Sequence, residues 1–135
     1  MAYLTGGDPD LQRSAELLLA LQEGGADVIE VGLPFSDPTA DGPVIQGAML
    51  RALRAGVRPR DVLGMLEELR PSLRVPVVVM GYCNTLLSLG EGLPGRLARA
   101  GVDGLLAVDL PPEEAGDWPE RLRAEGLDMI FLLAP

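Results

Sequence analysis

The sequence predicts an α/β fold with a parallel sheet, on three observations. Five short runs rich in Val, Ile, Leu and Met alternate with amphipathic segments, as in repeated βαβ units. Glycine or proline stands at most of the boundaries between these segments. The chain has 135 residues, 47% of them hydrophobic, which is enough to bury the core of one small domain. We therefore expect a single domain over residues 1–135.

Each element is expected where periodicity and end signals agree. The expected strands are Ala2 to Thr5, Val28 to Val31, Val75 to Met80, Leu105 to Asp109 and Met129 to Leu133. The expected helices run from after Asp8-Pro9 to Gly24, from Pro43 to before Gly56, from Pro59 to Arg70, from Pro94 to Ala100 and from near Pro119 to Glu125. Asp117 and Glu120 have the spacing of a capping box for the last of these helices.

Charge and composition exclude several classes of partner. The formal charge is −9, and the 11 basic residues, all arginine, are scattered singly, so nucleic acid is not an expected partner. No apolar run approaches the roughly 18 residues of a membrane span, and the N-terminus lacks the regions of a signal peptide. The single cysteine, Cys83, fits a reducing compartment. We expect a cytoplasmic protein without a membrane partner.

Two residue types are missing, and their absence limits the chemistry. The chain has no lysine and no histidine, so it can form no Schiff base and has no imidazole base or histidine metal ligand. Acid–base catalysis must then fall to Asp and Glu. We expect neither a metal site nor a cofactor in this chain.

In parallel α/β folds, ligands bind at the carboxyl ends of the strands. The last residues of each run and the first of each loop are therefore the candidate site residues. They are Thr5, Asp8, Glu30, Asp37, Asp41, Tyr82, Asn84 and Asp109, with Tyr3 and Met80 as lining. Five βα units can open into a doubly wound sheet or belong to an eight-stranded barrel, and the pattern alone leaves both open.

Glu30 is an unusual residue for a buried strand. Alternation places Val28 and Glu30 on one face and Ile29 and Val31 on the other, so Glu30 points into a barrel interior or cleft. Apolar surroundings raise the pKa of a carboxyl group toward neutrality, as a general acid–base residue needs. An ion pair with an arginine is the structural alternative.

The other acidic candidates also have two interpretations. Asp41 lies eleven positions after Glu30 on a loop rich in Pro and Gly, where it could face the same substrate or cap the helix at Pro43. Asp37, between Ser36 and Pro38, is interpreted as a turn residue. Asp109 is expected to support a neighbouring loop. Trp118, at a helix start, is interpreted as a packing residue.

Five motifs occur in a fixed order along the chain: YLTGGDPD, EVGLPFSDPTADGP, MGYCNTLLSLG, GVDGLLAVDLPPEE and MIFLLAP. Together they resemble the α subunit of tryptophan synthase over nearly the whole chain, and the second motif is the most specific. The resemblance implies a (β/α)8 TIM barrel, of which residues 1–135 supply about the first five strands as a partial domain. The chain starts almost inside a strand and stops at Leu133-Ala134-Pro135, where a strand should lead into a loop, so we expect an incomplete barrel.

The resemblance also implies an activity, the retro-aldol cleavage of indole-3-glycerol phosphate to indole and glyceraldehyde 3-phosphate in tryptophan biosynthesis. Glu30 would be the general acid–base residue, and Asp41 would bind the indole N–H. Four residues would line the indole pocket: Tyr3, Met80, Tyr82 and Leu106. The lyase would use neither metal nor Schiff base.

The family works with a pyridoxal-phosphate β subunit in an α2β2 heterotetramer, which is the partner that the resemblance implies. The residues that would face it are Pro34, Ser36, Asp37, Pro38 and Asn84. A barrel open after five strands exposes edges, so we expect the isolated fragment to be poorly active, aggregation-prone or oligomeric. Two alternatives are a non-catalytic half-barrel or regulatory subunit and another phosphosugar barrel enzyme.

Overall fold

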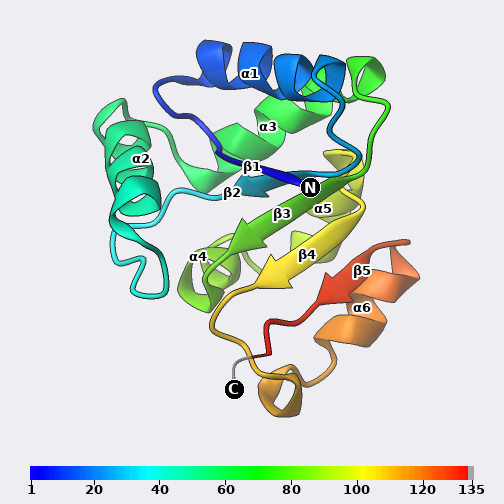
Figure 1. The fold of residues 1–135 in the computed structure, drawn as a ribbon. Helices are drawn as coiled ribbons and strands as arrows, with labels where there is room; N and C mark the ends of the chain where they lie inside the picture. The colour runs from blue at the N-terminus through cyan, green and yellow to red at the C-terminus, as the bar shows by residue number, and fades with distance from the viewer. Residues whose placement is uncertain (134–135) are drawn as a thin grey trace.

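The computed structural model describes residues 1–133, which form a parallel sheet with helices along one face (Figure 1). The strands are β1 (Ala2–Thr5), β2 (Ile29–Gly32), β3 (Val77–Gly81), β4 (Gly104–Ala107) and β5 (Asp128–Ile130). The helices are α1 (Leu11–Glu23), α2 (Pro43–Arg54), α3 (Pro59–Leu69), α4 (Cys83–Ser88), α5 (Leu93–Arg99) and α6 (Trp118–Ala124). Short 3₁₀ turns occupy Arg70–Ser72 and Pro112–Glu114.

The sheet order is β1-β2-β3-β4-β5, so neighbours in sequence are neighbours in space, and all pairs are parallel. A doubly wound sheet reverses its strand order at a switch point, whereas a barrel adds strands consecutively on one side. The observed order therefore selects the barrel-type arrangement, which the sequence pattern alone left open.

The predicted elements are present with small shifts at their ends. The predicted end of the last strand was wrong, because β5 pairs with β4 only as far as Ile130, and Leu133 is 84% exposed. Helix α4 was not predicted, since its residue Asn84 was placed among the first residues of a loop. The expected passage from strand to loop at 134–135 lies outside the described residues. No helix among residues 1–133 combines the length and apolar composition that a bilayer crossing requires.

The predicted capping box of α6 was also wrong. Asp117 is the N-cap residue, but its φ of −89° and ψ of 4° depart from the extended backbone that aims a cap side chain at the helix. Its carboxylate instead lies 3.8 Å from the Arg121 guanidinium. Side-chain hydrogen bonds cap the starts of two other helices: Arg13 N–H donates to the Asp10 carboxylate at 2.8 Å, and Arg58 N–H donates to the Asp61 carboxylate at 2.8 Å.

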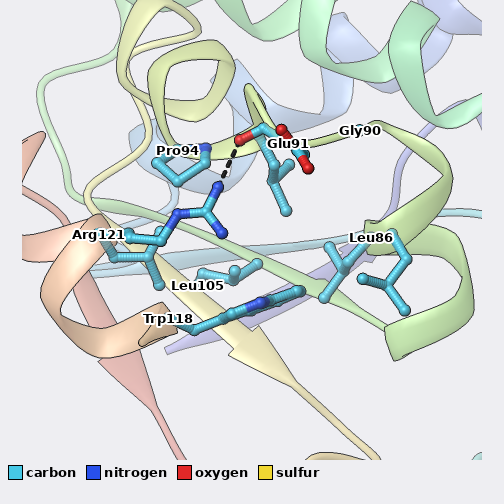
Figure 2. A pocket seen from close by; sticks show the side chains of 10 residues that line it. Leu86, Gly90, Glu91, Pro94, Leu105, Trp118 and Arg121 are labelled. Atoms are coloured by element: carbon cyan, nitrogen blue, oxygen red, sulfur yellow. Dashed lines mark hydrogen bonds between the residues drawn. The ribbon is translucent and has the colours of Figure 1, made fainter. Parts of the chain in front are cut away.

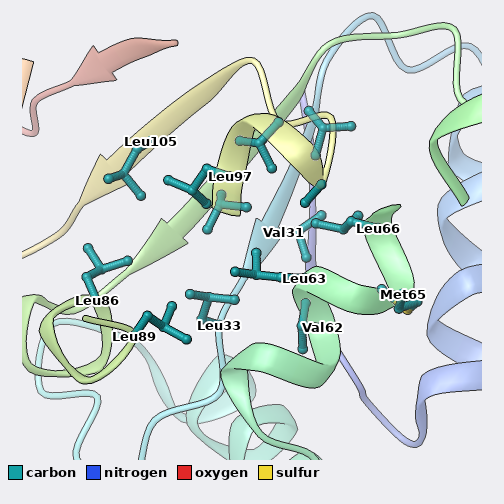
Figure 3. Close-up of a cluster of buried hydrophobic side chains, with 14 of the residues drawn as sticks. Val31, Leu33, Val62, Leu63, Met65, Leu66, Leu86, Leu89, Leu97 and Leu105 are labelled. Carbon is teal, nitrogen blue, oxygen red and sulfur yellow. The ribbon is translucent and has the colours of Figure 1, made fainter. Parts of the chain in front are cut away.

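Most of the core lies between the sheet and its covering helices (Figure 3). Strand residues on this face, such as Val31, Val79 and Leu105, contact Leu66 of α3 and the fully buried Leu97 of α5 within one cluster. The opposite face carries a second, smaller cluster. Its buried members are Met49, Val78, Met80, Tyr82 and Leu106. Because each face of the sheet packs against its own apolar cluster, most residues of the strands are hydrophobic.

Gly101 and Gly126 allow a matched test of packing at two helix ends. Both have positive φ, +70° and +79°, after α5 and α6. A Cβ on Gly101 would collide with the Arg70 side chain, which reaches Asp103 at 3.4 Å, whereas a Cβ on Gly126 would meet no atom within 4 Å. We expect Gly126→Ala to lower the free energy of unfolding of the natural chain by about 1 kcal/mol through backbone strain alone.

Gly101→Ala should cost about 1–3 kcal/mol more than Gly126→Ala, because Arg70 must also move. Urea denaturation of the two variants measures the difference. Equal losses would show that Arg70 does not constrain this position.

Candidate functional site

Strand pairing brings the candidate residues to the sheet face opposite the main helix layer of α1, α3 and α5. Tyr3 is paired with Glu30, and Glu30 with Val78, so their side chains form one row on this face. The next row along the strands contains Met80 and Leu106. The predicted orientation of Glu30, away from Ile29 and Val31, is confirmed. The four residues expected to line a pocket, Tyr3, Met80, Tyr82 and Leu106, lie in or against the same apolar cluster.

Glu30 is 9% exposed and lies in this apolar environment. Burial first, and the charge of Asp41 second, raise the pKa of its carboxyl group above its usual range. Among residues 1–133, five arginines form ion pairs, all of them with other carboxylates, and Glu30 forms none. The structural alternative of an arginine partner is therefore wrong for the described part of the chain. A buried carboxyl group without a counter-ion is well suited to exchange a proton.

Asp41 is held by a hydrogen bond and does not cap α2. Gly42 is the N-cap residue of α2, so the alternative interpretation of Asp41 as a cap is wrong. The Tyr82 hydroxyl donates to the Asp41 carboxylate at 2.7 Å and accepts from Ala40 N–H at 3.0 Å. Burial and the bond to Asp41 raise the pKa of Tyr82 to about 12, which keeps this hydroxyl a donor at neutral pH.

Phe35 of loop 33–42 and two residues of α2, Ile45 and Met49, complete the site, and the sequence analysis did not assign these three to it. The Phe35 ring packs on the Tyr82 ring, with centroids 5.1 Å apart and planes tilted by 30°. Ile45 and Met49 of α2 belong to the same apolar cluster as Tyr82. Ile45 and Met49 are four positions apart, which places them on one face of α2. Spacing along the helix does not show whether that face contacts the site or the larger core.

Tyr3 lies across Gly32. A Cβ at Gly32 would lie 2.8 Å from Tyr3 Cζ, so the absence of a side chain leaves room for the ring. The Tyr3 hydroxyl is 3.1 Å from the Thr5 hydroxyl, and burial raises the pKa of Tyr3 to about 12. The ring is therefore fixed next to Glu30 as an aromatic wall with a neutral polar tip.

The remaining acidic candidates support loops. Asp8 accepts two hydrogen bonds from Arg51, at 2.8 and 2.7 Å, and so joins the loop after β1 to α2. Asp109 accepts from Cys83 N–H at 2.7 Å, as expected for a supporting residue. Asp37 accepts from the Ser36 hydroxyl, as a turn residue does. Among the described residues, 1–133, no group of three or more His, Cys, Asp or Glu side chains is placed to hold a metal ion.

The residues expected at a partner surface differ in exposure. Ser36, Asp37 and Asn84 are exposed, Pro38 is half-buried, and Pro34 is buried. The exposed residues belong to loop 33–42 and α4, both of which lie at the carboxyl ends of the strands (Figure 1).

The Tyr82 hydroxyl should stabilise the native loop. Tyr82→Phe leaves the Asp41 carboxylate and Ala40 N–H without their partner, and we expect the free energy of unfolding to fall by about 1–3 kcal/mol. Tyr3→Phe, which removes only a bond between two hydroxyl groups, should cost about 1 kcal/mol or less. Denaturant unfolding of both variants compares them, and an equal loss would contradict the anchoring role of Tyr82.

The raised pKa of Glu30 predicts a pH-dependent stability difference. The pKa of Glu30 is higher in the folded state than in the unfolded chain, so the folded state binds more protons at pH values between these two pKa values. The free energy of unfolding therefore falls as the pH rises through this range. Glu30→Gln should therefore unfold at higher denaturant than wild type at pH 7. The gain should disappear below about pH 4, where the free carboxyl group is protonated.

The exposed Glu68→Gln serves as the control and should show no such pH dependence. A Glu30→Gln variant that gains no stability at pH 7 would contradict the raised pKa.

Comparisons with known proteins agree on one family. The family model described as "Tryptophan synthase alpha chain" matches residues 1–135. The chain is 56% identical over 135 residues to the tryptophan synthase alpha chain of Burkholderia thailandensis, with 98% of this chain and 50% of that protein covered. It is 48% identical over 134 residues to that of Synechococcus elongatus, again covering 98% and 50%. The chain thus spans about half the length of the curated relatives it matches.

Solved structures give the same result. Tryptophan synthase subunit alpha from Legionella pneumophila superposes with a TM-score of 0.93 at 42% identity, covering 98% of this chain and 51% of that one. A tryptophan synthase complex from Pyrococcus furiosus gives a TM-score of 0.93 at 43% identity, with 99% and 55% covered. Coverage of about half of each neighbour agrees with the partial-barrel architecture seen in the sheet.

Proposed function

Because the chain belongs to the tryptophan synthase alpha chain family, we propose that the natural protein cleaves indole-3-glycerol phosphate to indole and glyceraldehyde 3-phosphate in tryptophan biosynthesis. The observation that carries this proposal is Glu30. It is a buried carboxyl group with a raised pKa, it has no arginine partner within residues 1–133, and it stands beside an aromatic wall. A retro-aldol reaction without metal or Schiff base needs such a proton donor.

The protonated Glu30 carboxyl group would donate its proton to the indole ring carbon that bears the glycerol side chain. The resulting carboxylate would then take the proton of the adjacent hydroxyl group. As that O–H bond breaks, its electrons form the aldehyde C=O bond, and the electrons of the cleaved C–C bond restore the aromatic indole. One proton leaves the hydroxyl group and one enters the ring, so Glu30 returns to its starting state.

The Asp41 carboxylate would accept a hydrogen bond from the indole N–H and stabilise the positive charge that protonation creates on the ring. The Tyr82 hydroxyl, 2.7 Å from the Asp41 carboxylate, supports this role because it fixes the carboxylate on its loop before substrate arrives. Tyr3, Met80 and Leu106 would enclose the indole rings, since they form an apolar surface on the same sheet face as Glu30.

The partner in this proposal is a β subunit that carries pyridoxal phosphate and consumes the indole. Support comes from loop 33–42 and α4, which place the exposed Ser36, Asp37 and Asn84 at the same end of the sheet as the site. A loop that carries both Asp41 and these exposed residues would couple partner contact to substrate closure. This chain itself would supply only acid–base groups and an apolar pocket.

Indole release from indole-3-glycerol phosphate by the natural full-length chain tests the proposal. Glu30→Gln should lower kcat by about 10²–10⁴-fold while substrate still binds, because only the transferable proton is lost. Asp41→Asn should lower kcat by about 10²–10³-fold, because a neutral amide stabilises the ring cation less than a carboxylate does.

Glu68→Gln, the same chemical change at an exposed position on α3, should retain wild-type turnover. Full activity of Glu30→Gln would assign Glu30 a structural role and overturn the mechanism.

A further inference from the structure

A cavity of about 170 Å³ lies on the helix-covered side of the sheet (Figure 2). Its walls come from α4, α5, β4, α6 and the turn between α4 and α5. The apolar lining consists of Leu86, Leu87, Leu93, Pro94, Leu105, Trp118 and Leu122. Glu91 and Arg121 supply its charged groups, and Gly90 completes the lining.

The sheet separates this cavity from the candidate catalytic site. Leu105, which lines the cavity, belongs to the larger core cluster between sheet and helices. The next residue, Leu106, belongs to the cluster around Met80 and Tyr82 on the opposite face. Because successive side chains of a strand point to opposite faces, a molecule in the cavity and a substrate beside Glu30 would occupy different layers.

The size and lining of the cavity suit a planar aromatic molecule. Protein interiors contain few voids larger than a water molecule. A dry cavity of about 150 Å³ lined by aliphatic and aromatic side chains is large enough to bind benzene. Here the Trp118 ring lies along one side of the space, opposite Arg121 and Glu91, so it offers an aromatic surface for stacking (Figure 2).

The charged groups at the rim favour an uncharged ligand. The Arg121 guanidinium donates to the Glu91 backbone carbonyl at 2.6 Å and lies 3.8 Å from the Asp117 carboxylate. Its positive charge is thus already balanced by Asp117, and the neighbouring Glu91 side chain is itself acidic. An anionic ligand would meet more negative than positive charge at this opening.

We propose that this cavity is a second binding site, specific for uncharged planar aromatic molecules of one or two rings, formed by Trp118 and the leucines of α4, β4 and α6. Access is past Leu87, which is 64% exposed at the end of α4. The site does not depend on the proposed catalytic role of Glu30.

Titration of the natural full-length chain, labelled with ¹⁵N-tryptophan, tests the proposal with indole as the probe. The indole N–H signal of Trp118 is assigned by its loss in Trp118→Phe. We expect a saturable shift of this signal with half-saturation near 1 mM, within the affinity range of a ligand with nine non-hydrogen atoms. Benzoate, an anionic ring, should shift it at least about tenfold less strongly at equal concentration.

Two variants locate the binding. Leu87→Tyr places a bulky side chain at the opening and should weaken indole binding at least about tenfold, whereas Leu50→Tyr, at an exposed leucine of α2, should leave it unchanged. Arg121→Met should preserve indole binding within about threefold, since an uncharged ligand does not need the guanidinium.

Three outcomes would overturn the proposal. They are the absence of a saturable Trp118 shift up to about 10 mM indole, equal binding by Leu87→Tyr and Leu50→Tyr, and benzoate binding that exceeds indole binding and disappears in Arg121→Met. The last would make the cavity an anion site.

Discussion

The parallel pairing of β2 with β1 and β3 is the constraint on which the rest of the structure depends. Its register places Tyr3, Glu30 and Val78 in one row, on the face opposite the helices. A slip by one residue would move Glu30 into the packed layer with Val31 and Val79, where an ionisable group has no room and no partner. The helices hold this register, because Ile29 and Val31 are fully buried against them.

The loop that follows β2 depends on this arrangement in turn. It leaves the sheet beside Gly32, passes Phe35, and returns Asp41 to the Tyr82 hydroxyl at the end of β3. The two carboxyl groups are near enough that the charge of Asp41 adds to the raised pKa of Glu30. The raised pKa thus favours the protonated form of Glu30. Asp41 accepts a hydrogen bond from the Tyr82 hydroxyl, which stays protonated at neutral pH.

Helix α4 connects the two faces of the molecule. Tyr82 immediately precedes it and reaches the site face, while Leu86 and Leu87 line the cavity on the helix-covered side. The bond from Cys83 N–H to Asp109 fixes the start of α4 to the loop after β4. One short segment, from Tyr82 through Leu87, thus contributes side chains both to the site and to the cavity.

The sequence by itself determined the local structure and the available chemistry. Alternation within β2 predicted the direction of Glu30, glycine and proline marked the helix ends, and the lack of lysine and histidine in these 135 residues pointed to carboxyl groups as acid–base candidates. Only the tertiary structure decided the consecutive strand order, the bond from Tyr82 to Asp41 across 41 positions, and the cavity beside Trp118. Local patterns depend on neighbours along the chain. These other features arise from contacts between distant segments, which no local periodicity specifies.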